Sequence, residues 1–354
     1  RVVISTNAIA LQDQLIHKDI PDMMTALNLQ INASVLKGRS NYLCPRRLTL
    51  MRRRKLENVD ELRVLAKVLV WLQSSTSGDR NEINLNGSAE SLVWSRLSAE
   101  DEGCKLEVCL KRTGGRCPFY KARMAAESAH ILVVNHALLL ADTAAENRIL
   151  PEYNYLIVDE AHHLESATTD AMSFRLRAPD VTRLVREIGS TEQGILGQLL
   201  SLAKPLLKPS DLSALTVAIE RATDQAFRLD TAMTAYFKAL DFVLEELREG
   251  KPLGTYPQQA RILPATRTLP CWLDVEITWE QAKANLEALL EALKTVREIL
   301  RALAEADVEE AEDLLGSLAS INGNLQEIGI QVDNLTLSPD PNQIYWVELD
   351  PLQG

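Results

Sequence analysis

Three sequence patterns are missing from this chain. No unbroken apolar run reaches the roughly 18 residues of a transmembrane helix, and the first residues do not form the charged, apolar and small-residue series of a signal peptide. No Gly-x-x-x-x-Gly-Lys-Ser/Thr sequence occurs, so the loop that cradles nucleotide phosphates is absent. We therefore expect a cytoplasmic protein without a membrane partner, and a chain that does not assemble a complete ATPase by itself.

Positive charge is scarce overall but locally concentrated. With 354 residues, of which 46% are hydrophobic, the chain can bury a sizeable core and divide into two or three units. Its formal net charge is -11, yet residues 37–55 contain eight basic residues and no acidic one. Residues 104–123 contain six basic residues against one acidic residue, whereas residues 274–313 contain twelve carboxylates. The basic segments suit a phosphate-binding face, and a solvated basic surface without a partner is the alternative.

The chain has an odd number of cysteines, and three of them lie close together. In a reducing compartment such a group is more typical of a metal site than of disulfides. Gly114 and Gly115 let the chain curl between the clustered thiols, and Cys44 can supply a fourth thiolate. The gaps are longer than those of a zinc ribbon, which modestly favours an iron-sulfur cluster, but zinc and free buried thiols remain alternatives. The candidate ligands are Cys44, Cys104, Cys109 and Cys117, while Cys271 is expected to be a packed thiol.

The apolar run Tyr155-Leu156-Ile157-Val158 leads directly into two carboxylates, Asp159 and Glu160. A buried parallel strand ends at the carboxyl edge of its sheet. There Asp159 can reach the Mg²⁺ of a bound nucleotide, and Glu160 can orient the attacking water. The pattern indicates a Walker B site, although a chance Asp-Glu pair at a strand end is the plain alternative.

Two further strand-to-helix units predict an α/β fold with a parallel sheet. Residues 1–4 read as a strand and residues 8–16 as a helix, with Ser5 and Thr6 between them. Residues 129–134 read as a buried strand that ends in Asn135 and His136, and a helix follows over 137–140. The polar residues at these strand ends either bind a ligand such as a backbone phosphate or cap the following helices.

The remaining segments are predominantly helical. Residues 56–73 predict an amphipathic helix with an apolar face of Leu62, Leu65, Ala66, Leu69 and Leu72. From Leu164 onward we expect a helical insertion without a convincing strand before residue 344, and the strand at 344–349 can return to the first sheet. A capping-box pattern at Thr278-Trp279-Glu280-Gln281 predicts a helix start. The core-facing stripe of that helix is Leu286, Leu289, Leu290, Leu293, Val296, Leu300 and Leu303.

Taken together, these stretches resemble the iron-sulfur DNA helicases of superfamily two, in the DinG and XPD branch. The resemblance rests on VVISTNAIALQDQLI, KGRSNYLC, CPFYKAR, ILVVNHALLL and LIVDEAHHLE, which cover residues 1–165. It implies an α/β fold: a partial RecA-like parallel-sheet motor domain with a cysteine-rich iron-sulfur insertion and a large all-helical Arch insertion. The implied parts are motor domain 1 at 1–36 and 124–165, the cluster domain at 37–123, the Arch at 166–340 and a return strand at 341–354.

The resemblance also implies a function and residue roles. The expected activity is that of an ATP-dependent 5′-3′ DNA helicase of DNA repair or replication, monomeric, with ATP as substrate and single-stranded or forked DNA as partner. A 4Fe-4S cluster would be held by Cys44, Cys104, Cys109 and Cys117. Asp159 would hold Mg²⁺, Glu160 would polarise water, and His162 would couple the nucleotide site to DNA. The residues expected at the nucleic acid are Ser5, Thr6, Lys37, Arg39, Tyr42, Asn135 and His136.

The chain departs from this family by lacking the phosphate loop and the arginine-rich second motor domain. We expect truncation rather than natural loss of activity to explain these absences. The alternative from another functional class is a non-catalytic iron-sulfur or zinc module that binds single-stranded nucleic acid through the basic segments.

Overall fold

A computed structural model describes residues 1–53, 59–100, 104, 109–110, 113–248, 258–305 and 308–349. The chain divides into two compact units, Arg1–Ser173 and Phe174–Gly354. The sequence-based boundary between motor and helical parts lay slightly earlier, after residue 165. Among the described helices, none combines the length and the apolar character that crossing a membrane would need.

A four-stranded parallel sheet organises the first unit, in the order β2-β3-β1-β4. Val3 in its central strand pairs with Leu132 on one side and Leu156 on the other. The core beside the sheet contains Val3, Leu132, Val134 and Leu138. This confirms the predicted α/β class with a partial RecA-like sheet. The strands are β1 (Val2–Thr6), β2 (Ala33–Val35), β3 (Ile131–Asn135) and β4 (Tyr155–Val158).

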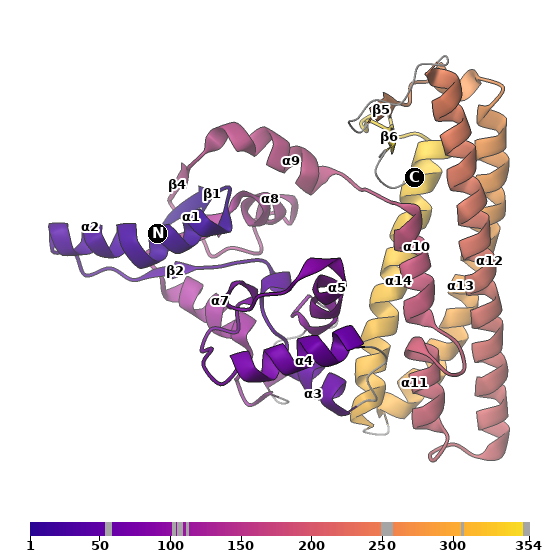
Figure 1. The fold of residues 1–354 in the computed structure, drawn as a ribbon, viewed down its shortest axis with the longest axis horizontal. Coiled ribbons are helices and arrows are strands. Elements are labelled where there is room, and N and C mark those ends of the chain that lie inside the picture. The colour runs from indigo at the N-terminus through magenta and orange to yellow at the C-terminus, as the bar shows by residue number, and fades with distance from the viewer. Residues whose placement is uncertain are drawn as a thin grey trace. The chain divides into compact units, whose positions relative to one another are not determined.

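Helices follow these strands as the sequence pattern predicts (Figure 1). The first begins at Ile9 and continues through a π-helical turn to Leu27, where Asn28 ends it in the left-handed conformation with a φ of 50°. The helices of this layer are α1 (Ile9–Gln14), α2 (Ile20–Leu27), α7 (Pro118–Ser128), α8 (His136–Ala144) and α9 (Leu164–Met172).

β4 differs from the buried strand that its apolar residues predict. Tyr155 is 69% exposed, Leu156 42% and Ile157 52%. Within the described residues β4 pairs only with β1, so it is an edge strand, and burial of a parallel strand requires partners on both sides and both faces. An apolar run therefore identified the strand correctly but not its environment.

Between β2 and α7, the described residues include three α-helices that share a core of their own. These are α3 (Pro45–Arg53), α4 (Val59–Trp71) and α5 (Gly87–Leu97). The buried face of α4 is formed by Val64, Leu65, Val68 and Trp71. The predicted face was wrong at Leu62, which is 57% exposed, and at Ala66, which is also exposed. Several apolar faces compete on a helix this rich in Val and Leu, and the neighbours on α3 and α5 decide which one is buried.

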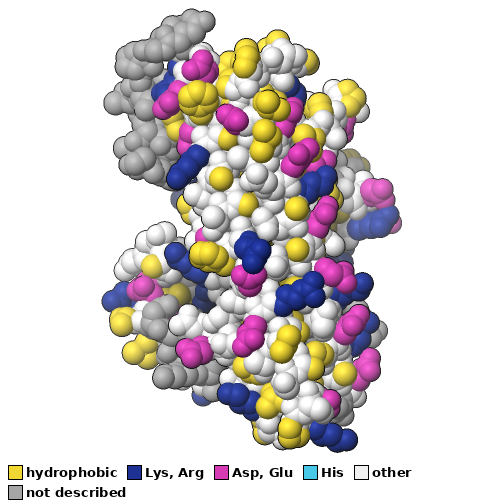
Figure 2. Space-filling view, turned by 90° about the vertical axis from the view of Figure 1, so that its right-hand side faces the viewer, with side chains coloured by type: hydrophobic (Ala, Val, Ile, Leu, Met, Phe, Trp, Pro, Cys, Tyr) yellow, Lys and Arg dark blue, Asp and Glu magenta, His cyan; other side chains and the backbone are white. Residues whose placement is uncertain are grey.

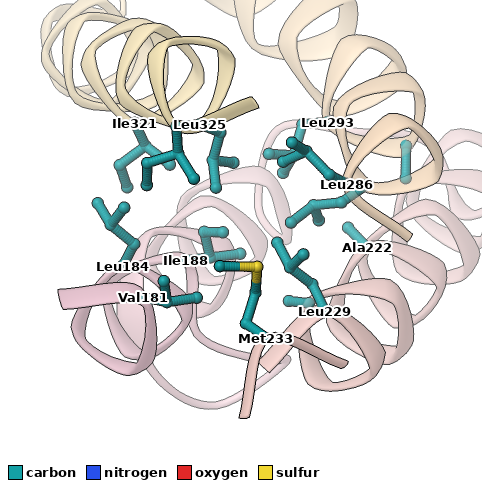
Figure 3. Close-up of a cluster of buried hydrophobic side chains, with 14 of the residues drawn as sticks. Val181, Leu184, Ile188, Ala222, Leu229, Met233, Leu286, Leu293, Ile321 and Leu325 are labelled. Carbon is teal, nitrogen blue, oxygen red and sulfur yellow. The ribbon is translucent and has the colours of Figure 1, made fainter. Parts of the chain in front are cut away.

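The second unit is a bundle of helices around one large core (Figure 1). Its elements are α10 (Ala178–Ile188), α11 (Gly194–Ala203), α12 (Pro209–Leu247), β5 (Gln258–Arg261), α13 (Trp272–Glu305), α14 (Glu309–Thr336) and β6 (Trp346–Leu349). Figure 3 shows Leu184 of α10, Met233 of α12, Leu286 of α13 and Leu325 of α14 pointing toward one another. The stripe predicted for α13 is confirmed, and Cys271 packs against this core.

Two predictions for this unit were wrong. The helix α13 begins at Trp272, so Thr278 lies inside it and not at its start. The Thr278 hydroxyl donates to the Asp274 carbonyl at 2.7 Å, and the capping-box sequence therefore does not cap this helix. The closing strand β6 does not return to the first sheet. It pairs antiparallel with β5, a strand that the helical pattern did not predict.

Charges on the surface drawn in Figure 2 are mixed. Lys and Arg side chains alternate with Asp and Glu side chains, and apolar side chains are scattered between them. Among the described atoms of this face, neither sign of charge forms a continuous track. Interspersed charges of this kind suit a solvated surface.

Candidate nucleotide, metal and nucleic-acid sites

Asp159 and Glu160 stand at the carboxyl edge of the parallel sheet. Val158, the last residue of β4, pairs with Ser5 of β1. The next amide, that of Asp159, donates to the Ser5 carbonyl at 2.8 Å. Both acidic side chains are exposed. Two carboxylates are thus presented at the edge where parallel sheets bind ligands, with the first anchored to the central strand.

The chain turns sharply at Glu160, which has a φ of 52°. The amide of His163 donates to the Glu160 carbonyl at 2.9 Å and closes a 3₁₀ turn over Ala161–His163. Within this turn, Nδ1 of His162 lies 3.2 Å from Oε2 of Glu160, and the rings of His162 and His163 have centroids 4.0 Å apart. The turn therefore gathers three polar side chains at one point of the surface.

Ser5 and His136, which were expected at a nucleic-acid-binding surface, form a buried pair. The hydroxyl of Ser5 lies 2.7 Å from Nδ1 of His136, and both residues are inaccessible, as is Thr6. Asn135 caps α8 by accepting the amide of Leu138 at 3.0 Å. A direct DNA contact by Ser5, Thr6 or His136 is incompatible with this burial, and for Asn135 the capping alternative is observed.

Lys37 and Tyr42, also expected at the nucleic acid, are internal. The Lys37 ammonium is 2.6 Å from Asp79 and 3.4 Å from Asp13, and its side chain is only 3% exposed. The backbone amide of Lys37 donates to the Tyr42 hydroxyl at 3.1 Å. Burial raises the pKa of Tyr42 to about 12. Lys37 is thus paired with Asp13 of α1 and with Asp79, and Tyr42 is buried beside it, so their predicted DNA contacts are not available in this structure.

Arg39 stays partly exposed, and its guanidinium lies 5.1 Å from the centroid of the Phe119 ring. Phe119 in turn contacts Tyr42 and Tyr120, with ring centroids 5.8 Å and 5.4 Å away. Arg39 therefore packs over an aromatic group at the edge of the cysteine site.

The four clustered cysteines share one buried site. Cys44, Cys109 and Cys117 lie in a single apolar cluster, and Cys104 packs against it. All four are free thiols, and the chain between them curls through Gly114 and Gly115 with φ values of 57° and 77°. Cys44 is positioned by its amide, which donates to the Leu97 carbonyl at 2.8 Å. The donor set fits a thiolate-bound metal centre enclosed by aromatic rings.

Thiol-thiol hydrogen bonds make the acidities of this cluster unequal. Hydrogen bonds with Cys104 and Cys117 raise the pKa of Cys109, whereas the hydrogen bond from Cys109 lowers the pKa of Cys117 to about 7. Burial raises the pKa of Cys44. Of Cys44, Cys109 and Cys117, Cys117 is thus the thiol most ready to become the thiolate that metal binding requires.

Comparisons with known proteins identify one family match and several similar proteins. Residues 88–181 match the family described as DEAD_2. The chain is 32% identical over 212 residues to 3'-5' exonuclease DinG of Bacillus subtilis, covering 59% of this chain and 22% of that protein. It is 33% identical over 205 residues to ATP-dependent helicase DinG of Mycobacterium tuberculosis, which covers 53% of this chain and 30% of that protein. These matches show that part of the chain is similar to DinG-like helicases.

A third relative extends the DinG-like match into the helical unit. ATP-dependent DNA helicase DinG of Photobacterium profundum is 25% identical over 352 residues, which covers 95% of this chain and 45% of that protein. The chain spans less than half the length of each of these three relatives. The DEAD_2 match includes Cys104, Cys109, Cys117 and the turn at Glu160.

The DinG-like motifs did not reveal every residue on which these sites depend. Asp13 and Asp79 neutralise Lys37, but Asp13 lies within the helix predicted over residues 8–16 and Asp79 belongs to none of the predicted sites. Phe119, which links Arg39 to the cysteine site, was visible only as part of CPFYKAR. His163 carried one signal, its position directly after His162.

Proposed function

We propose that this chain is the central part of an ATP-dependent 5′-3′ DNA helicase, in which Asp159 binds the Mg²⁺ of ATP and Glu160 activates the attacking water. The observation that carries the proposal is the placement of both carboxylates at the carboxyl edge of the sheet, beside the end of β1. The relatives named as ATP-dependent helicases support the same activity. Residues outside 1–354 would supply the phosphate loop and the second motor domain.

The four thiols are proposed to hold a 4Fe-4S cluster. Such a cluster would cross-link the segment around Cys44 to the segment between Cys104 and Cys117 and so stiffen the insertion. The bond from the Lys37 amide to Tyr42 joins this insertion to the strand end at β2. Metal analysis separates the cluster from the zinc alternative, because a cluster contains about four irons per chain and a Cys₄ zinc site a single zinc.

Single-stranded or forked DNA is the proposed partner, in repair or replication. The burial of Lys37 and Tyr42 moves the proposed contacts to accessible cations near the cysteine site, namely Arg52 on α3, Arg116 beside Cys117 and Lys121 on α7. Cations at the surface can release counterions from phosphates, whereas a buried lysine in an ion pair cannot.

The test uses a protein extended on both sides of residues 1–354 and purified without oxygen. ATP hydrolysis should be stimulated by single-stranded DNA, and Glu160→Gln should abolish hydrolysis while leaving DNA binding intact, because it removes the group that activates water. Hydrolysis that persists in E160Q contradicts the assigned role. Salt-sensitive DNA binding by an extended protein without any hydrolysis would instead support the non-catalytic binding module.

A further inference from the structure

We propose that Glu160, His162 and His163 form a binding site for one divalent transition-metal ion, with Zn²⁺ as the physiological candidate, distinct from the Mg²⁺ that Asp159 is proposed to bind. One ligand atom of each of the three side chains lies within 4.8 Å of the other two. Glu160 and His162 are well exposed, with 44% and 67% of their side chains accessible, so an ion can reach the site from solvent.

The backbone already holds the three ligands together. The three ligands lie within four consecutive positions, so ion binding closes no long loop and costs little chain entropy. The left-handed conformation of Glu160 and the bond from the His163 amide to the Glu160 carbonyl, 2.9 Å long, fix the turn before any ion arrives. Ion binding costs less free energy when the ligands already lie on a folded turn than when binding must first bring them together.

The donor atoms select the class of ion. Two imidazole nitrogens and one carboxylate oxygen suit Zn²⁺, which is bound at about 2.0–2.2 Å by such ligands, and in a tetrahedral site this places neighbouring ligand atoms about 3.3 Å apart. Nδ1 of His162 and Oε2 of Glu160 are 3.2 Å apart, which matches that spacing. Mg²⁺ prefers oxygen ligands in an octahedron and is a poor fit. Three protein ligands would leave a fourth position for water, as in three-ligand zinc sites.

Occupation of this site by Zn²⁺ would affect ATP hydrolysis, an effect that rests on the proposed function. Glu160 would become a metal ligand and could no longer activate the attacking water, and His162 would be immobilised beside it. Zn²⁺ should therefore inhibit ATP hydrolysis. His163 takes no part in the proposed hydrolysis, so it is the residue whose removal separates metal binding from activity.

Binding is tested on the chain of residues 1–354, by equilibrium dialysis against Zn²⁺ with metal analysis. His163→Ala and His162→Ala should each bind one Zn²⁺ fewer than the unaltered chain, or bind it at least ~10-fold more weakly. His17→Ala is the matched control, because His17 is exposed on the first helix far along the chain from the turn. All four proteins keep the same cysteines, so thiol-bound zinc cancels in the comparison. Imidazole NMR signals of His162 and His163 should shift together on Zn²⁺ addition.

Equal Zn²⁺ stoichiometry and affinity in H163A, H162A and the unaltered chain would overturn the proposal, as would an equal loss in H17A. Circular dichroism shows whether each variant is folded. In the extended protein, H163A should retain basal ATP hydrolysis and lose at least ~10-fold of its sensitivity to Zn²⁺. Absence of hydrolysis in every protein would refute the proposed function while the dialysis result still decides the metal site.

Discussion

At the scale of single residues, Lys37 shows that a basic segment of the sequence need not form a basic surface. It begins the segment with eight basic residues, yet its ammonium group is enclosed by Asp79 and Asp13. A buried lysine must be paired, because an isolated charge in the interior is strongly disfavoured. Arg52, in the same segment, remains accessible. The sign of a charge is readable from sequence, but its availability to a phosphate depends on what the fold brings to it.

Replacing Lys37 by Met should therefore reduce stability more than DNA affinity. The variant leaves Asp79 without its partner, and we expect the free energy of unfolding of the first unit to fall by about 3 kcal/mol, at the low end for broken buried pairs because Asp13 retains water. Urea titration followed by tryptophan fluorescence measures it. Lys121→Met, at an exposed position, should change the value by less than about 0.5 kcal/mol. Unaltered stability together with lost DNA affinity in K37M would instead support the predicted contact of Lys37 with DNA.

At the scale of elements, α13 and α14 are joined by a polar contact at the border of their apolar interface. The Asp333 carboxylate accepts from Lys283 Nζ at 2.7 Å and from Trp279 Nε1 at 3.0 Å. Burial raises the pKa of Asp333, but these two hydrogen bonds and the Lys283 charge outweigh it, so the pKa falls below its usual value of 3.8. The hydrogen bond with Asp333 raises the pKa of Lys283 above its usual value of 10.5.

The directions of these shifts fix the pH dependence of stability. A lowered carboxyl pKa contributes stability that is complete above pH 3.8 and disappears as pH falls further, and the raised lysine pKa contributes stability that is complete below pH 10.5 and is lost above it. Asp333→Asn should lower the unfolding free energy by about 1 kcal/mol at neutral pH. The difference from the unaltered chain should shrink below pH 3.8, as measured by denaturant titration over pH. A difference that is independent of pH would contradict the ionic contact.

At the scale of the whole molecule, the two units have separate cores. Among the described residues, the core of the helical unit contains only residues from Leu176 onward, whereas the cysteine cluster and the sheet core lie within the first unit. A change confined to one core should leave the other intact, because the cooperative unit of unfolding is a packed core.

Removal of the metal proposed at the cysteines should accordingly destabilise the first unit alone. After chelation, hydrogen exchange monitored by mass spectrometry should show loss of protection around Cys44, α5 and α7, with protection of α12 and α13 unchanged. Cys117→Ser without chelation should give the same pattern, and Cys271→Ser, outside the cluster, should not. Equal loss of protection in both units would contradict separate cores.

Much of the fold could be predicted because local rules dominate it. Apolar runs followed by polar residues located β1, β3 and β4 with their helices, and the leucine stripe located α13. The start of α13 was misplaced because Thr278 can satisfy either an N-cap or a carbonyl within a helix, and sequence does not say which. The β5-β6 pair was missed because pairing of distant short strands leaves no local signal.

For the sites, the sequence by itself determined the chemical groups: two carboxylates after a strand, four thiols around two glycines, and two adjacent histidines. The tertiary structure alone decided which of them are available. It buried Ser5 against His136 and Lys37 against Asp79, and it presented Glu160, His162 and His163 on one exposed turn. The reason is physical: the identity of a side chain fixes its charge and its donors. Desolvation and partners from distant segments fix whether that chemistry faces water, a ligand or the protein itself.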